Sequence, residues 1–130
     1  MANQVHILTF PIQGGTTTGA LGTIPLVGSA LLFKAPSAKL GGGITILEAE
    51  LTFRSTGLGT FQLYTATEGT IGLNGTITSA FGTSSIAAGT TYPMTISDGF
   101  VDADEWVMLA QTGSALYPGG NIHIAYVMGK

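Results

Sequence analysis

Two carboxylates, Glu48 and Glu50, have a spacing that suits catalysis. In an extended strand, side chains two residues apart lie on the same face, about 7 Å from each other. A carboxylate pair at such a separation can hydrolyse a glycosidic bond. That reaction also needs a pocket that raises the pKa of the acid. The simpler interpretation is an outward polar stripe, which Arg54 continues, so Glu48, Glu50 and Arg54 are candidate interface residues.

The densest charge in the chain is a run of four acidic residues: Asp98, Asp102, Asp104 and Glu105. Calcium binds six to eight oxygen ligands, so these carboxylates form a candidate Ca²⁺ site. Their spacing does not match an EF-hand loop. The alternative is a solvated turn, because Asp98 precedes a glycine and this dipeptide favours a tight bend. An electrostatic contact with a partner is a third interpretation of the same residues.

His6 and His123 are the two histidines of the chain, which has no cysteine. Pairing of the terminal strands would allow them to approach each other. Zinc normally takes at least three protein ligands, and no third ligand is near either histidine in the sequence. We therefore expect a structural role or a weak pH-sensitive contact. No metal and no other cofactor is expected.

Five large aromatic residues, Tyr64, Tyr92, Trp106, Tyr117 and Tyr126, are candidates for a sugar-binding platform. Trp106 opens an alternating strand and is most simply a core residue. Tyr117 lies in a Pro-Gly-Gly turn, so it is the better candidate for an exposed aromatic side chain and for an interface residue. The triple glycine at 41–43 precedes a strand rather than a helix, which favours a hairpin turn over a phosphate-binding loop.

The chain is poor in charge. Only 8% of its residues are charged, against about 25% in an average soluble protein, while 45% are hydrophobic and 20 of 130 are glycine. A surface of this kind favours a protein that is part of an assembly. It argues against a free enzyme. The four basic residues are scattered, which argues against nucleic-acid binding.

A length of 130 residues predicts one domain over residues 1–130. Residues 1–4 are expected to form a flexible arm, and 13–22 a flexible loop. The start of the chain has no basic segment followed by an apolar one, so no secretory signal is expected. The longest apolar stretch, 24–33, is interrupted by proline and glycine and is too short to span a membrane. No contact with membranes is expected.

Strand patterns separated by glycine-rich turns continue along the whole chain, and no segment has a helical period. The segment 80–88 is expected to be a loop of small residues. About eight strands without helices indicate an all-β fold, a β-sandwich or a barrel. The expected fold is an antiparallel β-sandwich, and eight strands in two packed sheets is the count of a jelly roll, although periodicity does not separate a jelly roll from another sandwich. In a jelly roll the first and last strands are neighbours. The expected strands are 5–10, 28–35, 44–54, 60–67, 70–78, 91–97, 105–111 and 121–128. The segment 70–78 contains Asn74-Gly75, a strong hairpin signal, so it is either one strand or a tight hairpin.

The longest strand, 44–54, has the alternation of a half-buried antiparallel strand. A strict period of two divides its residues between two faces. One face is expected to contain Thr45, Leu47, Ala49, Leu51 and Phe53, and the other Ile44, Ile46, Glu48, Glu50, Thr52 and Arg54.

The chain resembles small all-β virion proteins of tailed bacteriophages, especially capsid decoration proteins. The likeness lies in the Gly/Thr/Ser/Ala-rich strands, in the segment 44–54 followed by Ser-Thr-Gly-Leu-Gly-Thr, and in the ending 106–127. It implies a module, commonly a homotrimer, that contacts the major capsid protein. Such modules bind the outer surface of the capsid in the virion and stabilise the shell.

A second hypothesis is a carbohydrate- or receptor-binding β-sandwich, such as a phage tail tip or a lectin-like module. It predicts saturable glycan binding that Tyr117→Ala or Trp106→Ala weakens. A third hypothesis, a small hydrolase, lacks a positioned nucleophile and base.

Overall fold

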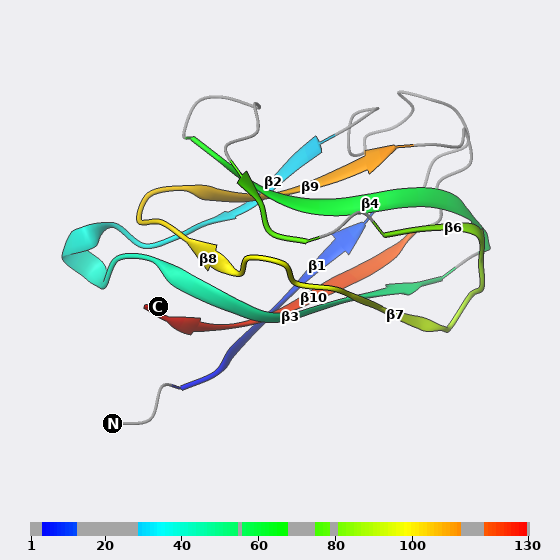
Figure 1. The fold of residues 1–130 in the computed structure, drawn as a ribbon. Helices are drawn as coiled ribbons and strands as arrows, with labels where there is room; N and C mark the ends of the chain where they lie inside the picture. The colour runs from blue at the N-terminus through cyan, green and yellow to red at the C-terminus, as the bar shows by residue number, and fades with distance from the viewer. Residues whose placement is uncertain are drawn as a thin grey trace.

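Two antiparallel sheets pack face to face in the computed structural model, which describes residues 4–12, 29–54, 56–67, 75–78, 81–112 and 119–129 (Figure 1). The first sheet has the order β1-β10-β3-β7, with β8 also paired to β3. The second has the order β2-β9-β4-β5, with β6 also paired to β4. The strands are β1 (His6–Ile12), β2 (Ser29–Lys34), β3 (Ile44–Phe53), β4 (Gly57–Ala66), β5 (Gly75–Thr76), β6 (Phe81–Ile86), β7 (Thr91–Met94), β8 (Phe100–Val101), β9 (Trp106–Thr112) and β10 (Gly120–Met128). The predicted all-β sandwich is confirmed.

The strand order is that of a jelly roll. The chain alternates between the sheets from β1 to β4, and β9 and β10 again lie in different sheets. The first and last strands are neighbours, with His6 opposite Tyr126 and Ile12 opposite Gly120, as the sequence predicts. Apart from β5 and β8, which have two residues each, the strands in the described part of the chain are the eight of this fold. One short 3-10 turn, η1 (Ala38–Leu40), precedes β3.

The core lies between the two sheets, where inward side chains of β3 and β4 meet. Phe53 of β3 and Phe61 of β4 are both buried, and their ring centroids are 5.4 Å apart. The Phe53 ring also packs against Tyr92 of β7 at 5.9 Å. Buried Leu51, Leu63, Val107, Leu109, Ile122 and Ile124 belong to the same cluster. Burial of this apolar surface is the main force that holds the sheets together.

A row of four aromatic rings joins the sheets on the side of β1 and β2. Phe10 of β1 stacks on Phe33 of β2 at 5.7 Å, Phe33 on Tyr126 of β10 at 5.8 Å, and Tyr126 on His6 at 5.2 Å. Stacked rings at these separations each contribute about 1 kcal/mol beyond their buried area. The row thus fastens the first strand to the opposite sheet.

A β-bulge in β3 corrects the predicted division of this strand into two faces. Glu48 is opposite Ala125 and Ile46 is opposite Tyr126, so Leu47 is the extra residue. Such an insertion reverses the alternation beyond it. Ile44 and Ile46 are therefore buried on the same side as Ala49, Leu51 and Phe53, whereas Leu47 is exposed beside Glu48.

Two further local predictions were wrong. We expected Pro11 to end the first strand, but β1 continues through it to Ile12. Within the described residues β1 pairs with β10 alone, and an edge strand tolerates a proline. The segment 80–88, expected to be a loop, contains β6, which pairs with β4. Backbone pairing with β4 overrides the low strand propensity of the glycine and serines in β6.

Parts of the predictions lie outside the described residues. These are residues 1–3 of the expected arm, the expected loop 13–22, the first residues of the predicted strand 70–78, and Tyr117. In the part of the chain that the structure does describe, no helix is both long and apolar enough to cross a membrane.

Candidate functional site

The outward side of the β1-β10-β3-β7 sheet is the candidate functional surface, and we call it the open face. Its side chains alternate with those of the core, so they project away from the second sheet. The register places them in rows across the strands. The rows are Pro11, Asn121, Thr52 and Thr91; then Thr9, His123, Glu50 and Pro93; then Ile7, Ala125 and Glu48 beside Leu47.

The open face is held in place by hydrogen bonds between neighbouring side chains. Thr9 Oγ1 lies 3.0 Å from His123 Nδ1, which joins β1 to β10. Thr52 Oγ1 lies 3.3 Å from Thr91 Oγ1, which joins β3 to β7. Cross-strand pairs of this kind contribute roughly 0.2 to 1 kcal/mol each. The face is therefore a fixed surface of mostly uncharged side chains.

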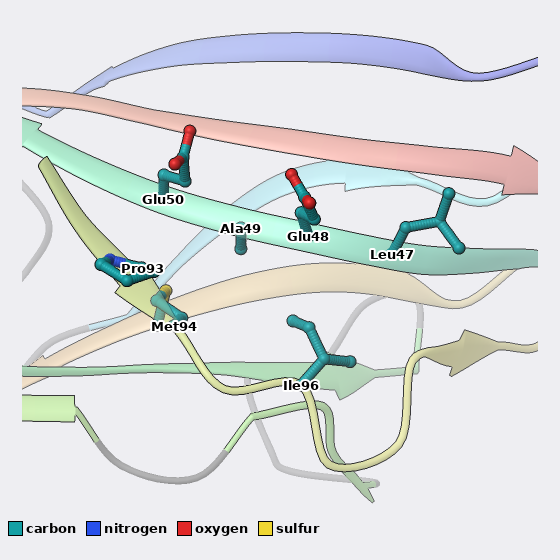
Figure 2. Close-up of a pocket in the computed structure, with 7 residues that line it drawn as sticks. All are labelled: Leu47, Glu48, Ala49, Glu50, Pro93, Met94 and Ile96. Carbon is teal, nitrogen blue, oxygen red and sulfur yellow. The ribbon is translucent and has the colours of Figure 1, made fainter.

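The charges of the open face are carboxylates near its centre and a guanidinium at its end. Figure 2 shows Glu48 and Glu50 projecting from the same side of β3. Glu48 is exposed and Glu50 is half-buried between Pro93 and His123. Arg54 follows the last residue of β3, and its Nη2 donates a hydrogen bond to the carbonyl of Ile12 at 3.5 Å. Glu48 and Glu50 thus share one outward side of β3, and Arg54 is exposed directly after this strand.

A shallow pocket of about 330 Å³ lies beside the two carboxylates, between β3 and the β7 segment. Its other lining residues are Leu47, Ala49, Pro93, Met94 and Ile96 (Figure 2). Apart from the two carboxylates, the residues that line the pocket are apolar, with no histidine and no aromatic ring among them. A glycosidase additionally needs groups that bind a sugar and enclose the acid. Beside Glu48 and Glu50, the pocket therefore offers mainly apolar contacts.

Two of the four acidic residues of the calcium hypothesis, Asp98 and Asp104, make separate local contacts. Asp98 Oδ1 accepts a hydrogen bond from the backbone N–H of Phe100 at 3.2 Å, which caps the turn before β8. Asp104 lies 3.8 Å from Lys34 and has a φ of 67°. Asp98, Asp102 and Glu105 line a second pocket of about 220 Å³. Within the described residues, however, no three acidic or histidine side chains are close enough to hold a metal ion.

We expect calcium to leave the stability of the protein unchanged. A cation that bound only the folded state would raise the free energy of unfolding by about 2.7 kcal/mol at a concentration of 100 times its Kd. The melting temperature would rise with it. Thermal melting with millimolar Ca²⁺ and with a chelator therefore tests the site directly. Coincident melting curves are expected, and a rise with calcium that Asp102→Asn removes would contradict this account.

The two histidines lie on opposite sides of the first sheet. His6 stacks on Tyr126 in the aromatic row that faces the second sheet. His123 is bonded to Thr9 on the open face. The terminal strands pair as predicted, but His6 is opposite Tyr126 and His123 is opposite Thr9. The expectation that the two rings approach each other was therefore wrong, and each has its own structural contact.

The aromatic side chains of the sugar-platform hypothesis are spread over the molecule. Tyr92 packs on Phe53, and its hydroxyl accepts a hydrogen bond from Ala87 N at 2.8 Å. Tyr64 donates a hydrogen bond to the Gln62 side chain, and Tyr126 lies in the aromatic row. Among the described residues these tyrosines form no shared platform, and Tyr117 lies beyond the described part.

Trp106 is located differently from the core position that the sequence favours. Val107 and Leu109 of β9 point into the core cluster, so alternation places Trp106 and Met108 on the outward side of the second sheet. Met108 is 1% exposed and Ala66, opposite Trp106, is 0% exposed. The indole Nε1 is also buried and has no hydrogen-bond partner among the described residues. At this end of β4 and β9 the outward side chains are therefore buried or half-buried.

No protein-family model and no curated protein matches the chain. Among solved structures, the chain is similar to one in the "Cyanophage Pam1 capsid asymmetric unit", at 16% sequence identity and a TM-score of 0.51, over 97% of this chain and 84% of that chain. A chain from Bacillus endospore appendages aligns over 98% of this chain and 93% of its own length, at 16% identity and a TM-score of 0.38. PirA aligns over 97% of this chain and 95% of its own length, at 14% identity and a TM-score of 0.34. At these identities the likeness concerns the fold alone.

Proposed function

We propose that this chain is a non-enzymatic structural protein of a phage particle, and specifically a decoration protein that binds the outer surface of the capsid in the virion. The observation on which this rests is a jelly roll with an outward sheet face of mostly uncharged side chains, in a chain of which only 8% of the residues are charged. The similarity in fold to a chain of a cyanophage capsid supports the same proposal. The partner is then the major capsid protein.

The physical requirements of a decoration protein agree with the composition of the chain. A charge-poor surface gains free energy when it is covered, because little desolvation of ions opposes the burial of apolar area. Each copy needs only a modest affinity if several copies are linked, since linkage makes the later binding events intramolecular. We propose the homotrimer that the resemblance to capsid decoration proteins implies, which would present three identical open faces to a symmetric shell.

Heat resistance of phage heads tests the stabilising role. Heads are purified from a phage with the coding sequence of this chain deleted, and the purified protein is added back to half of them. We expect the heads without the protein to release DNA at a lower temperature, because the bound protein stabilises the assembled shell by mass action. DNA release is followed by the fluorescence of an intercalating dye.

The control is the same protein after heat denaturation, added at the same concentration. Equal release temperatures with and without folded protein would exclude the stabilising role. Saturable binding to a glycan array, with no binding to heads, would instead favour the carbohydrate-binding alternative.

A further inference from the structure

We propose that the open face is the surface that docks on the capsid, and that the capsid protein presents at least one lysine or arginine opposite Glu48 and Glu50. This inference rests on the proposed function and adds to it the side of the molecule and the chemistry of the contact. It follows from three observations: the exposure of apolar side chains, the signs of the charges, and the size of the face.

Apolar side chains are exposed on this side of the molecule. Ile7 is 69% exposed, Val5 is 53% exposed in the same alternation just before β1, and Leu47 is 45% exposed. Among the described residues, the remaining large hydrophobic with comparable exposure is Leu40, in η1. The opposite sheet differs, since Met108 and Ala66 on its outward side are almost completely buried. Among the described residues, the exposed large apolar side chains that lie on a sheet surface are thus those of the open face.

The charges of the open face favour a cationic partner over a second copy of the chain. Glu48 and Glu50 contribute two negative charges, and Arg54 at the end of β3 contributes one positive charge. Two copies placed face to face would therefore bury two uncompensated negative charges. Removing such charges from water costs several kcal/mol each unless they are paired. A partner with one additional cation neutralises the contact, and the pocket beside Glu48 and Glu50 has room for its side chain.

The size of the face accounts for the need for several copies. Four strands spaced about 4.8 Å apart and seven residues of about 3.3 Å rise give a footprint of roughly 400 Å². A stable interface buries about 800 Å² on each partner. One open face alone therefore binds weakly, and occupancy of the shell depends on linked copies. This is consistent with the trimer proposed above.

The test compares two lysine substitutions of equal charge change, Glu48→Lys on the open face and Asp102→Lys in the turn after β8. Both native side chains are exposed, so both variants should fold. Binding to heads that lack the chain is measured by co-sedimentation over a range of protein concentrations. We expect Glu48→Lys to weaken binding at least about tenfold, because it places like charges opposite each other in the contact. Asp102→Lys should change it less than about twofold.

A second variant, Glu48→Gln with Glu50→Gln, keeps the shape of both side chains and removes only their charge. We expect weaker binding with a smaller dependence on salt concentration, because fewer charges meet in the contact. Its use keeps the inference testable if the lysine variant fails to fold.

Three results would overturn the inference. Equal binding by Glu48→Lys and Asp102→Lys would show that docking uses another surface. A loss of trimer mass in the glutamine variant, with unchanged binding to heads per protein chain, would show that the open face joins copies of the chain. Failure of the wild-type protein itself to bind heads would refute the proposed function, and this inference with it.

Discussion

Phe53→Ala is expected to destabilise the protein by about 3 to 5 kcal/mol, the range observed for removal of a buried phenylalanine side chain. Phe53 is 1% exposed and its ring contacts both Phe61 of the opposite sheet and Tyr92 of β7. Alanine would leave a cavity between the two sheets. Because domains of this size are stable by only about 5 to 15 kcal/mol, the melting temperature should fall by roughly 10 to 20 °C.

Leu47→Ala is the matched control, since Leu47 lies on the same strand but on the open face. It is 45% exposed, so its removal should change stability by less than about 1 kcal/mol. Urea unfolding monitored by circular dichroism measures both variants. Similar losses for Phe53→Ala and Leu47→Ala would contradict the division of β3 into a core side and an outward side.

Gly120→Ala is expected to be the other strongly destabilising substitution, at about 3 kcal/mol. Gly120 begins β10 opposite Phe53, and a Cβ there would lie 2.1 Å from the carbonyl oxygen of Thr52 and 2.7 Å from the Cα of Phe53. Both atoms belong to the backbone of β3, so no side-chain rotation relieves the clash. β10 would have to move away from the strand on which the core and the open face both depend.

Gly75→Ala in β5 is the comparison for this substitution. Its Cβ would meet Thr65 Oγ1 at 3.2 Å, the end of a side chain, and Gly75 itself is exposed. The expected cost is below about 1 kcal/mol. Equal costs for Gly120→Ala and Gly75→Ala, measured by thermal unfolding, would show that the β10–β3 pair adapts easily.

The sandwich was predictable from the sequence, but the order of its strands was not, because strand order is not written in the periodicity of single strands. Alternating segments such as 60–67 place Phe61 and Leu63 inside, and the structure confirms both as buried. The pairing of the first and last strands follows from the jelly roll itself. Period-two patterns therefore identify most strands when their inward residues are large and apolar.

Local irregularities were not predictable, because they depend on pairing rather than on composition. The bulge at Leu47 is defined by the register of β3 against β10, which no single strand encodes. β6 likewise depends on pairing with β4. The outward location of Trp106 also escaped prediction, since a tryptophan that opens an apolar strand looks like a core residue from its sequence alone.

The candidate site was predictable in its charges but not in its extent. The spacing of Glu48, Glu50 and Arg54 indicates one outward stripe; Glu48 and Glu50 project from the same side of β3, and Arg54 is exposed directly after this strand. Ile7, Thr9 and His123 join that stripe only through the register of β1 and β10 with β3. The acidic residues 98–105 are close in sequence, and Asp98, Asp102 and Glu105 line one pocket, but among the described residues no three acidic or histidine side chains are placed to hold a metal ion.

The most direct test of the proposed decoration role is the number of copies of this chain that bind to one head. Heads that lack the chain are titrated with purified protein, and the ratio of this chain to the major capsid protein is measured after sedimentation. The account predicts saturation at a fixed ratio, in multiples of three copies per site, because the shell offers a defined set of equivalent positions. No binding, or binding that rises without saturation, would contradict the role of a capsid decoration protein.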